Sequence, residues 1–352
     1  MWLTLYNQRK LQVLVELSSV CNAACPQCDR FKPGTLDTHE FLQQRIWTVS
    51  EFRNAFEPDD LQHMENILFS GLYGEPTTCK DLLDIVKYVR DVSPDTTIDI
   101  TTNGSTRTTE WWQELGRIGG SKIFIQFDID GINQEMHSRY RRNTSLAKIL
   151  DNMDAYASTN PGRHSILTVV YAHNKPYLKQ IRELAIQHGA VAFDQLESAR
   201  FFQERGAVYK YQDRDGNDHQ LEQVDETLLS LIPDSRKIRN FKLEDNVYSD
   251  DTHAISCSAA AERRLQLDYN GNVWPCCWIQ TAVDHGTGSS DPKIKYLQDL
   301  RASGKINVFK HSLGDILSTD WLNGGLEESI SSCITANKAC IKWCSNLKDS
   351  SK

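Results

Sequence analysis

Apolar residues in the first 197 positions gather into six short runs, and the stretches between them carry apolar residues at helical spacing. The runs, which have the length and composition of buried strands, cover 11–17, 66–71, 97–104, 122–131, 165–173 and 190–197. Between them, DLLDIVKYVRDV places Leu82, Leu83, Val86 and Val89 on one helical face, and KPYLKQIRELAIQHG ends at Gly189, a suitable C-cap. Repeated strand, helix, strand units predict an α/β fold with a parallel sheet, either a partial barrel or a doubly wound sheet.

The pattern changes after residue 197. Residues 198–256 are polar and charge-rich, which predicts a connector with one helix at DETLLSLI (225–232). The stretch LQLDYNGNVWPCCW (265–278) resembles a hairpin that turns at Asn270-Gly271. We therefore expect a first domain over 1–197, a connector over 198–256, and a cysteine-rich second domain over 257–352.

Composition narrows the class of protein. With 352 residues, 39% of them hydrophobic, the chain can bury one large core, or a core and a smaller domain. Its net charge of -8 makes nucleic acid an unlikely partner and favours a small or neutral substrate. No basic segment precedes an apolar core at the N-terminus, and no apolar run reaches the roughly 18 residues that span a bilayer. We expect a cytoplasmic protein without a membrane partner.

The ten cysteines are unevenly spaced. Three lie at 21, 25 and 28, Cys79 stands alone, and six lie between 257 and 344. Clustered cysteines in a reducing compartment indicate a metal site rather than disulfides. The first three follow the first predicted strand, and GLYGEP, TNG and DIDG follow the next three strands. These loops all fall at the carboxyl ends of parallel strands, where α/β folds build their sites.

The spacing CxxxCxxC fits three irons of a [4Fe-4S] cluster through Cys21, Cys25 and Cys28. The fourth iron would then lack a protein ligand and could bind a substrate or cofactor. A zinc site is the main alternative, but structural zinc takes four ligands, so Cys79 or a histidine would have to complete it.

This combination resembles the radical S-adenosylmethionine (SAM) superfamily, and the resemblance implies a partial (β/α)6 TIM-like barrel. GLYGEP resembles the family's Gly-Gly-Glu-Pro motif, TNG the element near the SAM ribose, and DIDG with HSRYR the segment whose arginine meets the SAM carboxylate. The implied SAM-binding residues are Gly74, Glu75, Pro76, Thr102, Asn103, Gly104 and Arg141. Two positions differ from the family: Gln27 replaces a bulky apolar residue, and Tyr73 replaces the first glycine.

The residue types suit this chemistry. An iron with an open position can chelate an amine and a carboxylate, while a carboxylate side chain accepts from the amine and an arginine fork pairs with the acid. Electron transfer into the sulfonium would give methionine and a 5'-deoxyadenosyl radical. The cofactor carries out this chemistry, and the protein positions it.

The C-terminal cysteines resemble the auxiliary-cluster domains called SPASM and Twitch. Cys257, Gly271 and Cys276 reproduce the opening spacing of these domains, and a reduced cysteine set follows in CITANKACIKWC. The resemblance implies a small, Cys-rich domain of hairpin and helices that holds one auxiliary [4Fe-4S] cluster. Its expected ligands are Cys257, Cys276, Cys340 and Cys344, with Cys333 as the leading substitute. Neighbouring Cys276 and Cys277 in a strand would point to opposite faces, so one would bind the cluster and the other pack. A zinc site is the alternative here as well.

The expected function is that of a radical SAM enzyme that abstracts hydrogen from a peptide or protein side chain. The auxiliary cluster would accept an electron from the substrate or bind it, and a flavodoxin or ferredoxin would supply the reducing electron. A small metabolite, such as an amino sugar or a nucleotide, is the alternative substrate. The first strand starts near residue 11, which leaves no room before it for a peptide-recognition domain. A non-catalytic zinc-binding module is the competing hypothesis, but it gives the GLYGEP and TNG loops no role.

Overall fold

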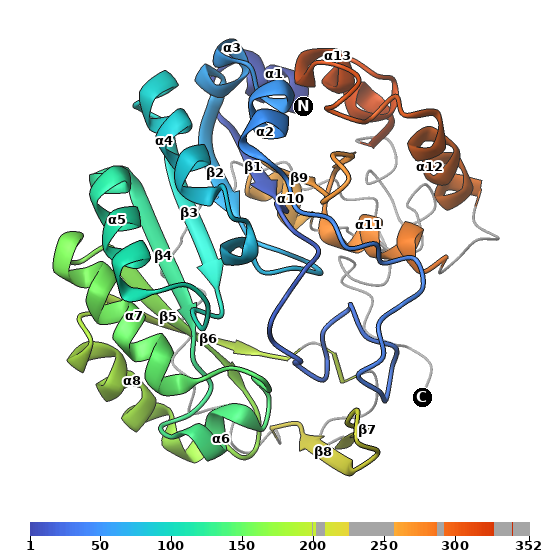
Figure 1. The fold of residues 1–352 in the computed structure, drawn as a ribbon. Helices are drawn as coiled ribbons and strands as arrows, with labels where there is room; N and C mark the ends of the chain where they lie inside the picture. The colour runs from blue at the N-terminus through green and yellow to red at the C-terminus, as the bar shows by residue number, and fades with distance from the viewer. Residues whose placement is uncertain (199, 202–207, 225–256, 287–291, 327–339, 341–352) are drawn as a thin grey trace, which may run out of the picture.

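One sheet crosses both halves of the chain (Figure 1). In the computed structural model, which describes residues 1–198, 200–201, 208–224, 257–286, 292–326 and 340, its order is β10-β9-β1-β2-β3-β4-β5-β6. The six strands predicted from the first half are all present: β1 (Leu11–Val15), β2 (Met64–Phe69), β3 (Thr97–Thr102), β4 (Ile123–Asp128), β5 (His164–Val170) and β6 (Ala192–Glu197). Each pairs in parallel with the next, which confirms the α/β class and the partial-barrel arrangement.

Helices follow the strands in the predicted alternation. Those of the first half are α1 (Trp2–Asn7), α2 (Val49–Ala55), α3 (Pro58–Gln62), α4 (Leu82–Val92), α5 (Thr109–Gly119), α6 (Gln134–Ser138), α7 (Leu146–Thr159) and α8 (Leu178–Gln187), with short 3-10 turns η1 (Pro76–Thr78), η2 (Gly120–Lys122) and η3 (Lys175–Tyr177). Figure 1 shows α4, α5, α7 and α8 lined up along the outside of the sheet. Helix α4 buries Leu82, Val86 and Val89 as expected, together with Ile85, while Leu83 is half-buried.

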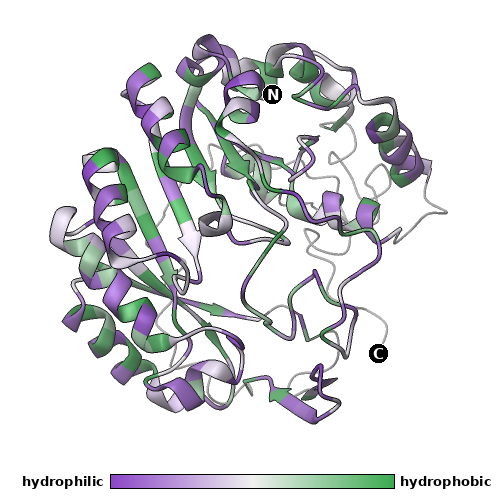
Figure 2. Cartoon of the chain, in the orientation of Figure 1, coloured by the Kyte–Doolittle hydropathy of each residue, from purple (hydrophilic) through white to green (hydrophobic). Residues whose placement is uncertain are grey.

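The core lies between this helical layer and the sheet. Val13, Ile67, Ile100, Ile125 and Phe127 are fully buried side chains of successive strands. Figure 2 shows hydrophobic residues along the strands of the large sheet, interrupted by hydrophilic ones in β3, and helices that carry both kinds of residue. Burial of these alternating apolar positions fixes the strand register, because a slip of one residue would turn each of them to the other face.

The region expected to be a connector contains a hairpin that the sequence analysis missed. Strands β7 (Val208–Gln212) and β8 (Asp218–Glu222) pair antiparallel and form a separate two-stranded sheet. Only Tyr211 and Leu221 of these strands are buried, so the hairpin reads as polar along the chain. The helix expected at 225–232 lies outside the described residues.

The C-terminal half joins the first-half sheet directly. Its elements are α10 (Ser258–Ala261), β9 (Arg264–Leu267), β10 (Val273–Trp274), α11 (Cys277–Asp284), α12 (Pro292–Ser303), α13 (Leu313–Leu317) and the wide turn η5 (Trp321–Gly325). The predicted hairpin turns at Gly271, whose φ of +83° suits glycine. Strand β9 pairs in parallel with β1, so this hairpin extends the barrel sheet.

One local expectation was wrong. Cys276 and Cys277 do not continue a strand: β10 ends at Trp274, Cys276 is the N-cap of α11, and Cys277 is its first residue. Pro275 between them and the strand accounts for the early end, because proline cannot donate to a strand ladder. No helix among the described residues is long and apolar enough to cross a membrane.

Candidate active site at the carboxyl ends of the strands

The cysteine loop begins shortly after β1 and places three thiols together. Cys25 is buried, and Cys21 and Cys28 are half-buried free thiols. Burial raises the pKa of Cys21, and the neighbouring charges of Glu75, Cys25 and Cys28 raise it further. Burial also raises the pKa of Cys25 to about 12. Thiols in this state are inert unless a cation stabilises their thiolates, as metal binding does.

The three thiols suit a [4Fe-4S] cluster, in which each cysteine binds a different iron. The charges of Cys25 and Cys28 both act on Cys21, so the three lie in one neighbourhood. A single zinc ion would need a fourth ligand beside them.

The GLYGEP loop after β2 packs against the chain just before Cys21. A Cβ atom on Gly74 would lie 1.7 Å from the carbonyl oxygen of Ser18, so only glycine allows this approach. The amide of Glu75 donates to the carbonyl of Val20 at 2.9 Å. Gly74, Glu75 and Pro76 are therefore held at the cysteine loop, as expected from their positions in the sequence.

Glu75 connects the GLYGEP loop to the TNG loop after β3. Its Oε1 accepts from the hydroxyls of Thr77 and Thr102 at 2.6 and 2.5 Å, and its Oε2 accepts from the amide of Asn103 at 2.9 Å. Burial raises the pKa of Glu75, but these donors favour its charged form. Gly104 follows with φ +66° and packs its backbone against Phe127.

Asn103 reaches the cysteine loop. Its Nδ2 donates to Oδ1 of Asn22 at 2.9 Å and lies 3.8 Å from the sulfur of Cys21. Thus the loops after β1, β2 and β3 contact one another.

Arg141 brings in the segment after β4. Its Nε donates to Asp130 at 2.6 Å, and its Nη1 lies 3.0 Å from Asp128. Burial disfavours the charge on Arg141, yet the two carboxylates hold its pKa well above the usual value. The guanidinium opposes the rise in the pKa of Cys25, which places it beside the cysteine loop. Arg141 was predicted from the sequence, whereas its two aspartate partners, which both lie in the DIDG segment, were not.

Both residues that depart from the family pattern have structural partners. The hydroxyl of Tyr73 donates to Asp284 of α11 at 2.9 Å. Oε1 of Gln27 accepts from the hydroxyls of Tyr171 and Ser198 at 2.9 and 2.8 Å, near the ends of β5 and β6. Neither set of partners was predictable, because each is more than 140 residues away in the sequence.

Residues 15–185 match the family model of the Radical SAM superfamily, and this span includes all four motif loops. The chain carries a radical SAM domain. Residues 15–185 therefore form a domain of the superfamily whose members bind a [4Fe-4S] cluster and SAM, and the prediction of a radical SAM enzyme is confirmed. The C-terminal auxiliary-cluster domain stays a prediction.

The comparisons with individual proteins agree with this radical SAM domain. Over 160 residues the chain is 24% identical to the GTP 3',8-cyclase of Klebsiella pneumoniae (strain 342), an alignment that covers 44% of this chain and 45% of that protein. The same enzyme of Edwardsiella ictaluri is 25% identical over 158 residues, with 44% and 45% covered. The aligned region thus spans less than half the length of these curated relatives.

Solved structures show the same fold. Streptococcus suis SuiB bound to S-adenosylmethionine superposes with a TM-score of 0.60 at 13% identity, covering 91% of this chain and 68% of SuiB. The enzyme anSMEcpe with bound AdoMet gives a TM-score of 0.55 at 14% identity, covering 89% of this chain and 78% of that one. Both coverages extend past the radical SAM domain into the C-terminal half.

In that half, three of the four expected auxiliary ligands lie within the described residues. Burial raises the pKa of Cys276 well above its usual value, and the nearby thiolates of Cys277, Cys340 and Cys257 raise it further. The charges that act on Cys277 come instead from Arg200 and Asp29, beside the cysteine loop. Neighbouring Cys276 and Cys277 thus lie in different surroundings, although the cause is a helix start rather than a strand. Cys333 and Cys344 lie outside the described residues.

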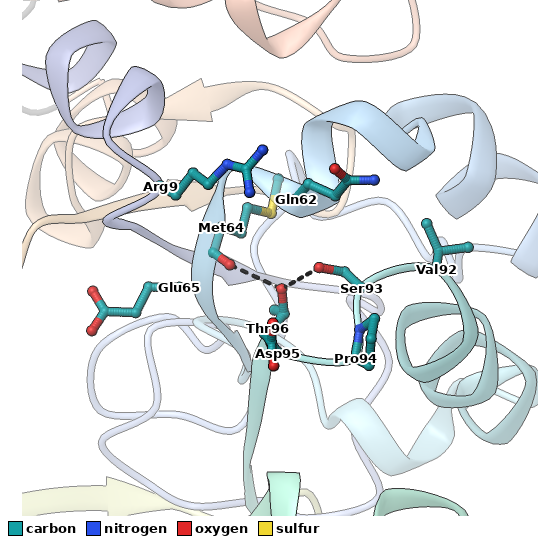
Figure 3. Close-up of a pocket in the computed structure, with 9 residues that line it drawn as sticks. All are labelled: Arg9, Gln62, Met64, Glu65, Val92, Ser93, Pro94, Asp95 and Thr96. Carbon is teal, nitrogen blue, oxygen red and sulfur yellow. Dashed lines mark hydrogen bonds between the residues drawn. The ribbon is translucent and has the colours of Figure 1, made fainter.

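A hollow of about 410 Å³ lies elsewhere on the radical SAM domain (Figure 3). It is lined by Arg9, by the start of β2, and by the turn before β3, where the hydroxyl of Thr96 donates to the carbonyl of Met64 at 2.9 Å. These are the amino ends of the strands, opposite the motif loops. The hollow therefore takes no part in the candidate active site.

Proposed function

We propose that this chain cleaves SAM reductively and that the resulting 5'-deoxyadenosyl radical abstracts a hydrogen atom from a substrate. The observation that carries the proposal is the contact among the loops after β1, β2 and β3, with Arg141 beside Cys25. Cys21, Cys25 and Cys28 would hold the cluster. The chemistry that a bound [4Fe-4S] cluster supplies is a one-electron reduction of the SAM sulfonium, for which a flavodoxin or ferredoxin would be the electron donor.

The side chains of the four loops would orient SAM. Oε2 of Glu75 accepts one hydrogen bond, from Asn103, so this oxygen retains capacity for the SAM amino group. Arg141 has five N–H donors, and its two aspartates engage Nε and Nη1. The guanidinium would therefore also meet the SAM carboxylate. Gly74, Pro76, Thr102, Asn103 and Gly104 would shape the loops around the cofactor.

An auxiliary [4Fe-4S] cluster is the second part of the proposal. Cys257, Cys276, Cys340 and Cys344 would bind it, and Cys333 is the substitute for either of the last two. The electrostatic proximity of Cys276 to Cys257 and Cys340 supports the assignment. This cluster would accept the electron left on the substrate or bind the substrate directly.

The proposed substrate is a peptide or protein side chain. Its support is the fold shared with SuiB, which has also been solved bound to the precursor peptide SuiA, at a TM-score of 0.57. A small metabolite is the second candidate, because the relatives of similar sequence include GTP 3',8-cyclases.

Anaerobic reconstitution tests the proposal. We expect about eight irons per chain from two four-iron clusters, and 5'-deoxyadenosine after addition of SAM and dithionite. Cys28→Ala should abolish 5'-deoxyadenosine formation, because two cysteines cannot hold the SAM-binding cluster. Stoichiometric zinc without SAM cleavage would instead establish a zinc-binding module.

A further inference from the structure

Six polar side chains meet where the cysteine loop faces helix α11. We call this set the junction cluster: Gln27, Asp29, His39, Arg200, Cys277 and His285. They come from the cysteine loop, the loop that follows it, the end of β6, and the two ends of α11. None of them is among the residues expected to bind SAM or a cluster, although Gln27 lies within the CxxxCxxC motif.

Arg200 is the centre of the junction cluster. Its Nη1 lies 2.8 Å from Oδ1 of Asp29 and also donates to the carbonyl of Gln27. The same guanidinium opposes the rise in pKa that burial causes at Cys28 and at Cys277. The junction cluster thus lies between the proposed SAM-binding cluster and the start of α11.

Two histidines complete it. The rings of His39 and His285 meet edge to face with centroids 4.4 Å apart. Phe41 packs on both rings, and on its other side it reaches Tyr73 of the GLYGEP loop at 5.8 Å. Burial lowers the pKa of His285, and His39 lowers it further, so the ring of His285 is neutral at neutral pH.

Four atoms in this set are buried without a hydrogen-bond partner among the residues that the structure describes. They are Nε2 of Gln27, Oδ2 of Asp29, Nε2 of His39 and Nε2 of His285. Gln27 is only 5% exposed, so its unpaired amide nitrogen is not satisfied by bulk water. A buried polar atom without a partner costs free energy, which a ligand that supplies the partner recovers.

The charge of the junction cluster selects the kind of ligand. Arg200 is already paired with Asp29, and His285 is neutral, so no net positive charge is available to neutralise a phosphate. What the set offers is an amide donor, a carboxylate acceptor and two imidazole nitrogens, beside the aromatic ring of Phe41. Such a set matches the donor and acceptor of an amide or hydroxyl group.

We propose that the junction cluster binds the substrate through an uncharged amide or hydroxyl group, and that a phosphorylated substrate is excluded. This inference rests on the proposed function, since a binding site for substrate is meaningful only if the chain cleaves SAM. A peptide amide and the hydroxyl of a small molecule share this chemistry.

The test uses the reconstituted full chain and an extract of cells grown in heavy water. A deuterated substrate transfers one deuterium to 5'-deoxyadenosine, which mass spectrometry detects. We expect transfer from an extract treated with alkaline phosphatase to equal transfer from the untreated extract. Ultrafiltration separates the sources, because a peptide or protein donor stays in the retentate and a small molecule passes.

Variants of the junction cluster test whether deuterium transfer to 5'-deoxyadenosine depends on it. His285→Ala and Asp29→Asn should each lower deuterium transfer about tenfold or more, the loss expected for a deleted buried hydrogen bond. The matched control His311→Ala replaces an exposed histidine and should keep wild-type transfer. Iron content, measured on every variant, shows whether the clusters are loaded.

Several results would overturn the inference. These are loss of transfer after phosphatase treatment, wild-type transfer by both variants, or no transfer from any extract while 5'-deoxyadenosine forms. Equilibrium dialysis with millimolar GTP adds an independent check. GTP that is retained by the wild-type protein but not by the Arg200→Gln variant would show that the junction cluster binds phosphate. Failure of the proposed function would look different, because no 5'-deoxyadenosine would then form, whether or not extract is added.

Discussion

Glu16, the residue directly after β1, accepts hydrogen bonds from the backbone of the GLYGEP loop. Its Oε1 accepts from the amides of Tyr73 and Gly74 at 2.6 and 3.1 Å, whereas its Oε2 is buried without a partner among the described residues. Burial raises the pKa of Glu16 to about 8, with Asp268 and Asp284 raising it and the two amides opposing. The side chain is therefore protonated at neutral pH, although the sequence offers no sign of it.

This raised pKa predicts a pH dependence of stability. The folded protein keeps the proton of Glu16 up to about pH 8, while the unfolded chain loses it near its ordinary value of 4.5. The stability from this group is complete below pH 4.5 and is lost as the pH rises towards 8, on the order of 5 kcal/mol in all. Glu16→Gln should remove that loss. Urea unfolding of the metal-free, reduced protein at several pH values measures it, and parallel profiles for both proteins would contradict the assignment.

The hairpin β7–β8 acts at the scale of an element, because it fastens the cysteine loop. The hydroxyl of Tyr209 accepts from the amide of Gly34 at 2.9 Å and donates to the carbonyl of Pro26 at 3.2 Å. Tyr211 is buried against the same loop and accepts from Arg142 at 3.2 Å. Figure 1 shows the hairpin beside the long loop that follows β1.

Loss of one of these contacts should loosen the loop. Tyr209→Phe removes both hydrogen bonds of the hydroxyl and should lower the free energy of unfolding by about 1–2 kcal/mol. It should also speed the loss of iron absorbance when the reconstituted protein meets air. Tyr296→Phe is the control, because Tyr296 is 45% exposed on α12 and its ring can keep its place beside Trp321. Equal unfolding midpoints and equal bleaching rates for the two variants would count against the fastening role.

The elements that the sequence predicted are those whose signal is local. Strands β1 to β6 can be recognised as apolar runs, and the β9–β10 turn can be recognised from Asn270-Gly271. In each case the signal comes from residues that are close together in the chain. The hairpin β7–β8 was missed because Tyr211 and Leu221 are buried against Phe31 and Leu36, in a loop about 180 residues earlier in the chain. The start of α11 was missed because the predicted strand was extended beyond Pro275, whereas β10 ends at Trp274.

At the scale of the whole molecule, the two halves share one sheet. Val13 of β1 stands opposite Leu265 of β9, and Trp47 donates to the carbonyl of Tyr269 at 2.8 Å. The four motif loops could be located from the sequence because each is a short run with a fixed spacing, and their binding of SAM stays a prediction. The junction cluster could not, because it is assembled from four segments whose meeting depends on how β9 joins β1. Tyr73 and Asp284 join the halves again at the edge of the proposed site.

Because the two halves share one sheet, the proposed auxiliary-cluster ligands should affect the stability of the barrel as well as the iron content. Cys276→Ser should lower the iron from about eight to about four per chain, because serine replaces a proposed ligand. It should also lower the unfolding midpoint of the whole chain in a single transition, since the hairpin that precedes Cys276 pairs with β1. Cys277→Ser is the matched control one residue away and should keep about eight irons. Iron loss in the Cys277 variant with full iron in the Cys276 variant would exchange their assigned roles, and two separate unfolding transitions would show that the halves fold independently.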